Sequence, residues 1–250
     1  MIIIESMTGA TNYVQRFECS ASKLVFKVRA VAKADFEGVF ATIVVVDKQG
    51  QQKVITPRAN LRDLLEISAS NEGLVQVKEN YTSGAISSYD YLATLELSNF
   101  GAVDLGGGYA QIQLDNCVTT TSWNIYGLDN ANLTSMIIKY EPLWNAADQY
   151  KQVDLTDCYA VALPKANLID VQLQFVNGRT IIYKPTELDA IVQEINELAE
   201  VEQNVANNGS SAIMVGSNKL YCIGVKNCVG MRVQYSQPTT FYKISDSILQ

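Results

Sequence analysis

Apolar and polar residues alternate with a period of two along most of this chain. In the segment 23–29, Leu24, Phe26 and Val28 share one face, while Lys23, Lys27 and Arg29 lie on the other. Such alternation predicts a strand with one buried face. The same pattern predicts further strands at Phe40–Val46, Gln52–Ile55, Leu74–Lys78, Tyr91–Leu97, Tyr109–Leu114, Thr120–Tyr126, Ser135–Tyr140, Tyr159–Leu163, Val171–Val176, Thr180–Lys184, Ala212–Val215, Leu220–Val225, Met231–Tyr235 and Thr240–Ile244. Short strands separated by turn residues predict an all-β sandwich or barrel.

Two segments have helical spacing instead. The first, Asn60–Leu65, has its three leucines on one face of a helix, with Asn60 as the N-cap and Asp63 three residues later, as in a capping box. The second runs from Thr186 to about Val201 and ends before Asn207-Asn208-Gly209. Its apolar stripe is Leu188, Ile191, Val192, Ile195 and Leu198, and Thr186 with Asp189 resembles a capping box. We expect this helix to pack over the end of a sandwich rather than to bind a partner.

The two predicted helices lie in matching sequence contexts. Each follows a strand, a glycine turn, a second strand and a proline: Thr42–Gly50 and Pro57 in the first case, Val171–Gly178 and Pro185 in the second. The glycines and the prolines are separated by the same distance, since 178 − 50 and 185 − 57 both equal 128. The equal separations indicate an internal duplication.

A second pair of segments supports the duplication. Gln111–Val118 and Cys222–Val229 both end in Asn-Cys-Val, at an offset of 228 − 117 = 111 residues. The shorter offset fits a smaller insertion in the second half, because surface loops change length at little cost. The competing interpretation is that any two β-rich segments look alike.

The duplication predicts two domains, residues 1–144 and 145–250. Pro142 lies near the boundary and ends the preceding strand, because proline cannot donate to a ladder. Each half then supplies roughly seven or eight strands, the number in a jelly roll of two four-stranded sheets. The predicted fold is all-β, with two tandem jelly-roll β-sandwiches (a double jelly roll), each with a short helix.

Composition narrows the classes of function. Hydrophobic residues make up 48% and charged residues 18%, enough for a large core, and the net charge of −7 is the wrong sign for neutralising nucleic-acid phosphates. The first residues lack the pattern of a secretory signal, and no run of about 18 apolar residues predicts a spanning helix. Five cysteines without a C-x-x-C pair fit reduced, buried thiols and synthesis in a cytosol.

The residues that usually carry catalysis are missing. The chain has no histidine, which removes the commonest general base and metal ligand, and Gly106-Gly107-Gly108 lacks the following Lys of a phosphate loop. We therefore expect no enzyme, and no catalytic, cofactor-binding or metal residue is predicted.

Two sets of residues could either bind a ligand or have an ordinary structural role. Asp104, Asp129, Asp154 and Asp157 suit either a calcium ion or solvated turns, and Tyr81, Tyr89, Tyr150 and Tyr242 suit either a binding face or ordinary packing.

Ile43–Leu65, Val171–Ile195 and the closing strand Met136–Trp144 make the chain resemble the small double jelly-roll major capsid proteins of tailless, membrane-containing icosahedral bacteriophages. The resemblance covers nearly the whole chain and rests on architecture. It implies a homotrimer of pseudo-hexagonal outline that tiles an icosahedral shell over an internal membrane. Implied partners are neighbouring capsomers, vertex and minor capsid proteins and, peripherally, lipid, with no direct nucleic-acid binding. The implied location is the virion, after synthesis in the host cytoplasm without secretion.

Two other classes of function stay open. A carbohydrate- or receptor-binding β-sandwich module of a phage or cell-surface appendage would use the tyrosine-rich loops. A glycoside hydrolase or lyase on a β-sandwich would need a pair of carboxylates across a groove, and the sequence singles out no such pair.

Overall fold

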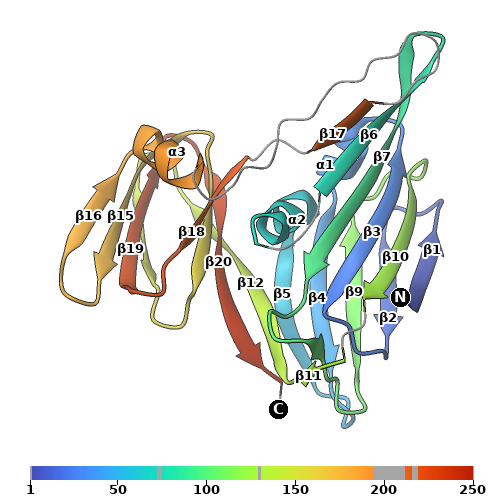
Figure 1. Ribbon diagram of the computed structural model, residues 1–250, viewed down its shortest axis with the longest axis horizontal. Helices are drawn as coiled ribbons and strands as arrows, with labels where there is room; N and C mark the ends of the chain where they lie inside the picture. The colour runs from blue at the N-terminus through green and yellow to red at the C-terminus, as the bar shows by residue number, and fades with distance from the viewer. Residues whose placement is uncertain (1, 72–74, 129–130, 194–211, 216–218, 250) are drawn as a thin grey trace. The chain divides into compact units, whose positions relative to one another are not determined.

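The computed structural model describes residues 2–71, 75–128, 131–193, 212–215 and 219–249, which form an all-β protein with mostly antiparallel sheets (Figure 1). Contacts within the chain define two compact units. Unit 1 comprises Met1–Ile138, Leu198–Ser217 and Ser247–Gln250, and unit 2 comprises Lys139–Glu197 and Asn218–Asp246. The chain thus first passes from unit 1 to unit 2 after Ile138, inside strand β12 (Met136–Asn145). The sequence had predicted this boundary after residue 144.

Unit 1 contains two large antiparallel sheets, with the strand orders β1-β10-β3-β7-β6-β17 and β2-β9-β4-β5. A short parallel pair, β8 (Ala102–Val103) with β11 (Leu133–Thr134), accompanies them. The strands of the large sheets are β1 (Ile2–Met7), β2 (Tyr13–Phe17), β3 (Lys23–Ala30), β4 (Phe40–Val46), β5 (Gln52–Asn60), β6 (Val75–Thr82), β7 (Ala85–Glu96), β9 (Tyr109–Asp115), β10 (Ser122–Leu128) and β17 (Ala212–Val215).

Unit 2 contains two four-stranded sheets, with the orders β12-β20-β14-β18 and β13-β19-β15-β16. Their strands, besides β12, are β13 (Tyr150–Asp154), β14 (Ala160–Pro164), β15 (Leu168–Phe175), β16 (Thr180–Tyr183), β18 (Leu220–Gly224), β19 (Cys228–Tyr235) and β20 (Thr239–Ile248). Most of β12 and β20 belongs to unit 2, and one end of each is assigned to unit 1.

The two units share one order of strands. In unit 1, eight strands are numbered 1 to 8 along the chain: β1, β2, β3, β4, β5, β7, β9 and β10. In unit 2 the corresponding eight are β12, β13, β14, β15, β16, β18, β19 and β20. With this numbering both units have one sheet with the core order 1-8-3-6 and another with the order 2-7-4-5. Unit 1 adds β6 and β17 beyond its sixth strand.

The alternating pattern determines which side chains enter each core. In β9 the side chains of Ala110, Ile112 and Leu114 are buried, while the intervening Gln111 and Gln113 are half-buried on the opposite face. The core of unit 1 also contains an aromatic group. The ring of Phe36 stacks on Tyr91 with centroids 4.2 Å apart and lies 5.8 Å from Trp123.

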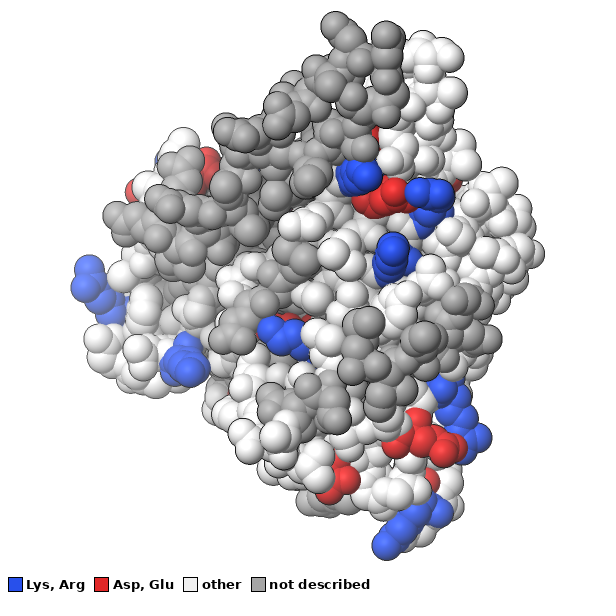
Figure 2. Space-filling model, turned by 45° about the vertical axis from the view of Figure 1, so that its right-hand side comes forward, with Lys and Arg blue, Asp and Glu red and all other residues white. Residues whose placement is uncertain are grey.

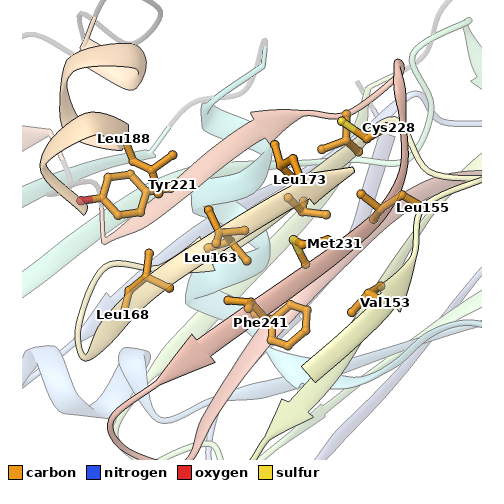
Figure 3. Packing of buried hydrophobic residues seen from close by; sticks show 14 of the residues in the cluster. Val153, Leu155, Leu163, Leu168, Leu173, Leu188, Tyr221, Cys228, Met231 and Phe241 are labelled. Carbon is orange, nitrogen blue, oxygen red and sulfur yellow. The ribbon is translucent and has the colours of Figure 1, made fainter. Parts of the chain in front are cut away.

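The core of unit 2 is mainly aliphatic (Figure 3). Leu163 and Phe241 come from one sheet, and Leu173 and Met231 come from the other. Leu188 of helix α3 (Pro185–Gln193) joins the same cluster and lies beside Tyr221. Helix α3 therefore belongs to the core of its unit.

Helix α2 (Leu61–Ala69) confirms the first predicted helix, and the Asn60 side chain accepts a hydrogen bond from the Asp63 N–H, 3.2 Å away. Helix α3 begins at Pro185, and its residues beyond Gln193 lie outside the described part of the chain. The Glu187 carboxylate accepts from the Lys184 N–H at 2.8 Å. The capping interaction therefore starts two residues before Thr186, the N-cap that the sequence predicted.

The comparison of strand orders corrects part of the predicted repeat. Gly50 and Gly178 both lie between strands 4 and 5 with positive φ, 84° and 81°, so this part is confirmed. Pro57, however, lies inside β5, where the register with β4 is irregular, and the helix starts only at Leu61. Strand β5 is an edge strand, and proline is tolerated at edges and bulges.

The pairing of the two Asn-Cys-Val segments is wrong. Cys117 follows β9, which is strand 7 of unit 1. Cys228 begins β19, which is strand 7 of unit 2. The segments therefore lie at opposite ends of equivalent strands. The alternation also missed β1, β2, β8, β11, β13 and the short helix α1 (Lys33–Glu37).

Candidate interaction surfaces

Two of the four aspartates considered for calcium, Asp104 and Asp154, accept hydrogen bonds within turns. Asp104 Oδ1 accepts from the Gly106 N–H at 2.9 Å, and Asp154 Oδ1 accepts from the N–H and hydroxyl of Thr156 at 2.9 and 2.6 Å. The hydrogen bonds from Thr156 lower the pKa of Asp154. Asp157 is exposed, and Asp129 lies outside the described residues. Among the described residues, no group of three or more His, Cys, Asp or Glu is placed to hold a metal ion.

The four tyrosines do not form one face. Tyr81 and Tyr89 lie on β6 and β7 of unit 1, whereas Tyr150 lies on β13 of unit 2. Tyr242 is buried in β20. Because Tyr242 is buried, the four side chains do not all belong to one exposed binding face.

The cysteines are free thiols, as expected. Cys117, Cys158 and Cys228 are buried, while Cys19 and Cys222 are only half-buried, so the expectation of burial holds for three of them. Burial raises the pKa of Cys117 to about 12, which keeps this thiol protonated at neutral pH. The buried cysteines act as small core residues.

An apolar cavity in unit 1 offers little room for a ligand. It is lined by Phe17, Cys19, Ile43, Leu97 and Ile137 among others and has a volume of about 10 Å³. Ligand pockets are usually of the order of 300 Å³ or more. This cavity is therefore a packing defect rather than a substrate site.

The outer face of the 2-7-4-5 sheet in unit 2 is rich in glutamine. Cross-strand register places Gln152, Arg232, Gln172 and Ile182 in one row across all four strands. The neighbouring residues in these strands, such as Val171 and Val233, face the core. The row therefore lies on the surface, and Ile182 is 53% exposed.

Tyr150 contacts the arginine of this face, Arg232, and is itself hydrogen-bonded to Asp170. The Arg232 guanidinium lies over the ring of Tyr150, 4.8 Å from its centroid. The Tyr150 hydroxyl donates to Asp170 at 2.9 Å, and this hydrogen bond raises the pKa of Tyr150. The contacts hold one charged and one aromatic side chain in defined positions on the surface.

The equivalent face of unit 1 has the same character. Arg16, Gln111, Val44 and Val54 form one row across its 2-7-4-5 sheet, in which Val44 is only 7% exposed. The Arg16 guanidinium lies 3.4 Å from the centroid of the Tyr109 ring. A second pair follows on the same sheet, with Arg58 at 3.7 Å from the ring of Phe40 and 3.7 Å from Asp115.

These two faces suit contact with another protein surface. Val14 and Val54 of unit 1 are 63% and 52% exposed, so apolar side chains accompany the glutamines and arginines. Protein interfaces are enriched in arginine and aromatic residues and depleted in lysine and glutamate. Sequence reasoning missed both faces, although the alternation that buries Ile112 and Leu173 also predicts which residues face outward.

Charge does not concentrate on the surface that Figure 2 displays. Basic and acidic side chains occur there singly or in small mixed groups among uncharged residues. None of the described helices is long and apolar enough to cross a membrane.

No known family model matches the chain, and no curated protein is significantly similar to it. Among solved structures, the chain is similar to the crystal structure of mavirus major capsid protein, with a TM-score of 0.33 and 7% identity. The match covers 98% of this chain and 86% of that chain. A TM-score of this size does not establish a shared fold.

Proposed function

We propose that both units are jelly rolls and that the chain is a double jelly-roll major capsid protein. The observation that carries the proposal is the repeated strand order, 1-8-3-6 with 2-7-4-5, in two units of one chain. Eight antiparallel strands in two sheets with two Greek keys define a jelly roll, an architecture common in viral shells. A helix follows strand 5 in both units, α2 after β5 and α3 after β16, which strengthens the case for duplication.

Homotrimerisation follows from the tandem arrangement. Three copies of a two-barrel chain supply six similar barrels, which approximates a hexagon under threefold symmetry. Hexagonal blocks tile a shell without an active site. The outer faces with Arg16 and Arg232 are suitable for contacts between copies or between neighbouring capsomers.

The remaining parts of the proposal concern partners and location. We expect vertex and minor capsid proteins as further partners and only peripheral contact with an internal membrane. The net charge of −7 disfavours direct binding of nucleic acid. The protein would then be a non-enzymatic component of the virion, synthesised in the host cytoplasm.

Light scattering coupled to size exclusion tests the proposal. A homotrimer has a mass of 3 × 27.5 = 82.5 kDa, and its negative-stain images are expected to have a pseudo-hexagonal outline. Arg232→Glu should weaken the trimer or the contacts between trimers, whereas Lys48→Glu, in an exposed turn, is the matched charge-reversal control. A protein that stays monomeric at all concentrations and binds a glycan array would overturn the capsid proposal in favour of a binding module.

A further inference from the structure

Glu96 of unit 1 is a nearly buried acid that holds an amine and a carboxamide at once. Its side chain is 4% exposed, and Oε1 lies 3.0 Å from the Nζ of Lys23. Its other oxygen, Oε2, accepts a hydrogen bond of 2.8 Å from the Nδ2 of Asn71. The Glu96 carboxylate therefore bridges Lys23 Nζ and Asn71 Nδ2, with one nitrogen atom on each of its oxygen atoms.

Three different parts of unit 1 bring these residues together. Lys23 is the first residue of β3 and is the cross-strand partner of Glu96, the last residue of β7. Asn71 lies just after helix α2, and its N–H donates to the Ser68 carbonyl at 3.1 Å. The Ser68 hydroxyl in turn accepts from the Glu96 N–H at 2.9 Å, which fixes the end of the helix against β7.

The three groups are those required for condensation of an amine with a carboxamide. We propose that Lys23 and Asn71 become joined by an isopeptide bond, with Glu96 as the catalytic acid and base. Glu96 accepts a proton from the Lys23 ammonium, and the free amine attacks Cγ of Asn71. The bond from Nζ to Cγ forms while the bond from Cγ to Nδ2 breaks. Protons pass through Glu96 from Nζ to Nδ2, so that one ammonium ion leaves for each bond formed.

The placement of the carboxylate favours this path. One oxygen contacts the nucleophilic nitrogen and the other contacts the nitrogen of the leaving group, so one side chain can serve both proton transfers. The Lys23 and Glu96 side chains are only 22% and 4% exposed, so the reacting groups are largely shielded from water. Fixed positions for the reactants also replace a search in solution, which is a large rate factor in intramolecular reactions.

A second acceptor contacts the carboxamide of Asn71. Asn71 Nδ2 also lies 3.2 Å from the Oδ1 of Asn99, so Asn99 helps to orient the carboxamide. The new bond would join residues 71 − 23 = 48 positions apart. A covalent link of this span constrains the unfolded chain and attaches the segment after α2 to the start of β3. The inference concerns unit 1 alone and does not depend on the capsid proposal.

Intact mass measured under denaturing conditions is the primary test. The folded wild-type protein is expected to be lighter than its sequence mass by one ammonia. Trypsin should then release one branched peptide in which Phe17–Lys27, uncleaved at Lys23, is joined to Asp63–Lys78. Fragmentation of this peptide should locate the bond at Lys23 and Asn71.

Variants distinguish catalysis from a simple structural role. Lys23→Arg, Glu96→Gln and Asn71→Ala should each restore the full mass and the two separate peptides. Asn71 is exposed, so its variant is the one least expected to disturb folding, and a circular dichroism spectrum like that of wild type verifies this. Lys33→Arg, which alters a separate lysine of unit 1 paired with Glu79 at 3.4 Å, is the matched control for Lys23→Arg and should retain the bond. Full mass in the folded wild-type protein overturns the proposal, as does loss of water with the link at Glu96.

Discussion

Helices α2 and α3 occupy the same place in the strand order of their units, yet different contacts anchor them. Helix α2 buries Leu61, Leu64 and Leu65 and is capped by Asn60. Helix α3 buries Leu188 but leaves Ile191 39% exposed, and its Asp189 accepts a hydrogen bond of 2.8 Å from the Tyr221 hydroxyl. The order of strands thus places a helix at this point, while each unit uses its own side chains to hold it.

The aromatic contacts inside the two cores also differ. Unit 1 stacks Phe36 on Tyr91, whereas unit 2 brings Tyr235 and Phe241 to a centroid distance of 6.5 Å amid leucine, valine and methionine. Cores tolerate such changes when volume and patterning are kept. A shared architecture with little shared sequence is therefore physically reasonable for the two units.

The largest expected effect comes from removing one core aromatic residue in each unit. Phe36→Ala and Phe241→Ala each truncate a fully buried ring, and each should cost about 3–5 kcal/mol. Trp123 is buried in unit 1, so its fluorescence in a Trp144→Phe background reports on unit 1, while circular dichroism reports on both units. We expect Phe36→Ala to lower the urea midpoint of the Trp123 signal more than Phe241→Ala does. Equal shifts of both probes by both variants would mean that the units unfold as one.

The helix of unit 2 provides the next comparison. Leu188→Ala removes a buried anchor and should destabilise the protein by about 2–5 kcal/mol in urea unfolding. Ile191→Ala changes an exposed residue of the same helix and should stay within about 0.5 kcal/mol of wild type. If the two variants were equally stable, α3 would not be anchored through Leu188.

The N-cap of α2 should have a smaller effect. Asn60→Ala removes the acceptor for the Asp63 N–H and the 2.8 Å hydrogen bond from Asn60 Nδ2 to the Glu37 carbonyl. A loss of about 1 kcal/mol is expected. Asn60→Asp keeps the acceptor and should recover part of this loss in thermal unfolding. No difference between the two variants would assign the effect to Nδ2 alone.

The smallest expected effect is a difference in acid sensitivity. The hydrogen bond from Arg29, 2.7 Å from Nε to Oδ1, holds the pKa of Asp90 below its usual range. Its contribution is thus fully present above the unfolded pKa, about 4, and is lost as pH falls through the lower folded value. Because Arg29 is mostly exposed, we expect only about 0.2–1 kcal/mol.

Unfolding in urea at several pH values checks this sign. Between pH 7 and about pH 3, the stability of wild type should fall more steeply than that of Asp90→Asn. Asp154→Asn, in unit 2, is the comparison, because at this exposed turn the pKa of Asp154 is lowered mainly by hydrogen bonds from Thr156, with Lys243 contributing less. Identical slopes for wild type and Asp90→Asn would rule out a stabilising role for the Arg29 pair.

Much of the local structure was predictable because it depends on neighbours in the chain. Strand β4 was predicted with its observed bounds, Phe40–Val46, and the turns at Gly50 and Gly178 were placed correctly. Asn60 was identified as an N-cap from its spacing to Asp63. Strand β13 was missed because Tyr150, Lys151 and Gln152 are all exposed and Val153 is its one buried residue.

The remaining features depend on contacts between distant segments. Alternation shows which side chains of a strand face the core, but the backbone hydrogen bonds that choose the neighbouring strand are the same for every sequence. For this reason the sequence alone determined most of the strands with their buried faces, and the presence of helices α2 and α3. Only the tertiary structure decided that the Asn-Cys-Val segments are not equivalent, that Tyr242 is buried, and that Glu96 lies between Lys23 and Asn71.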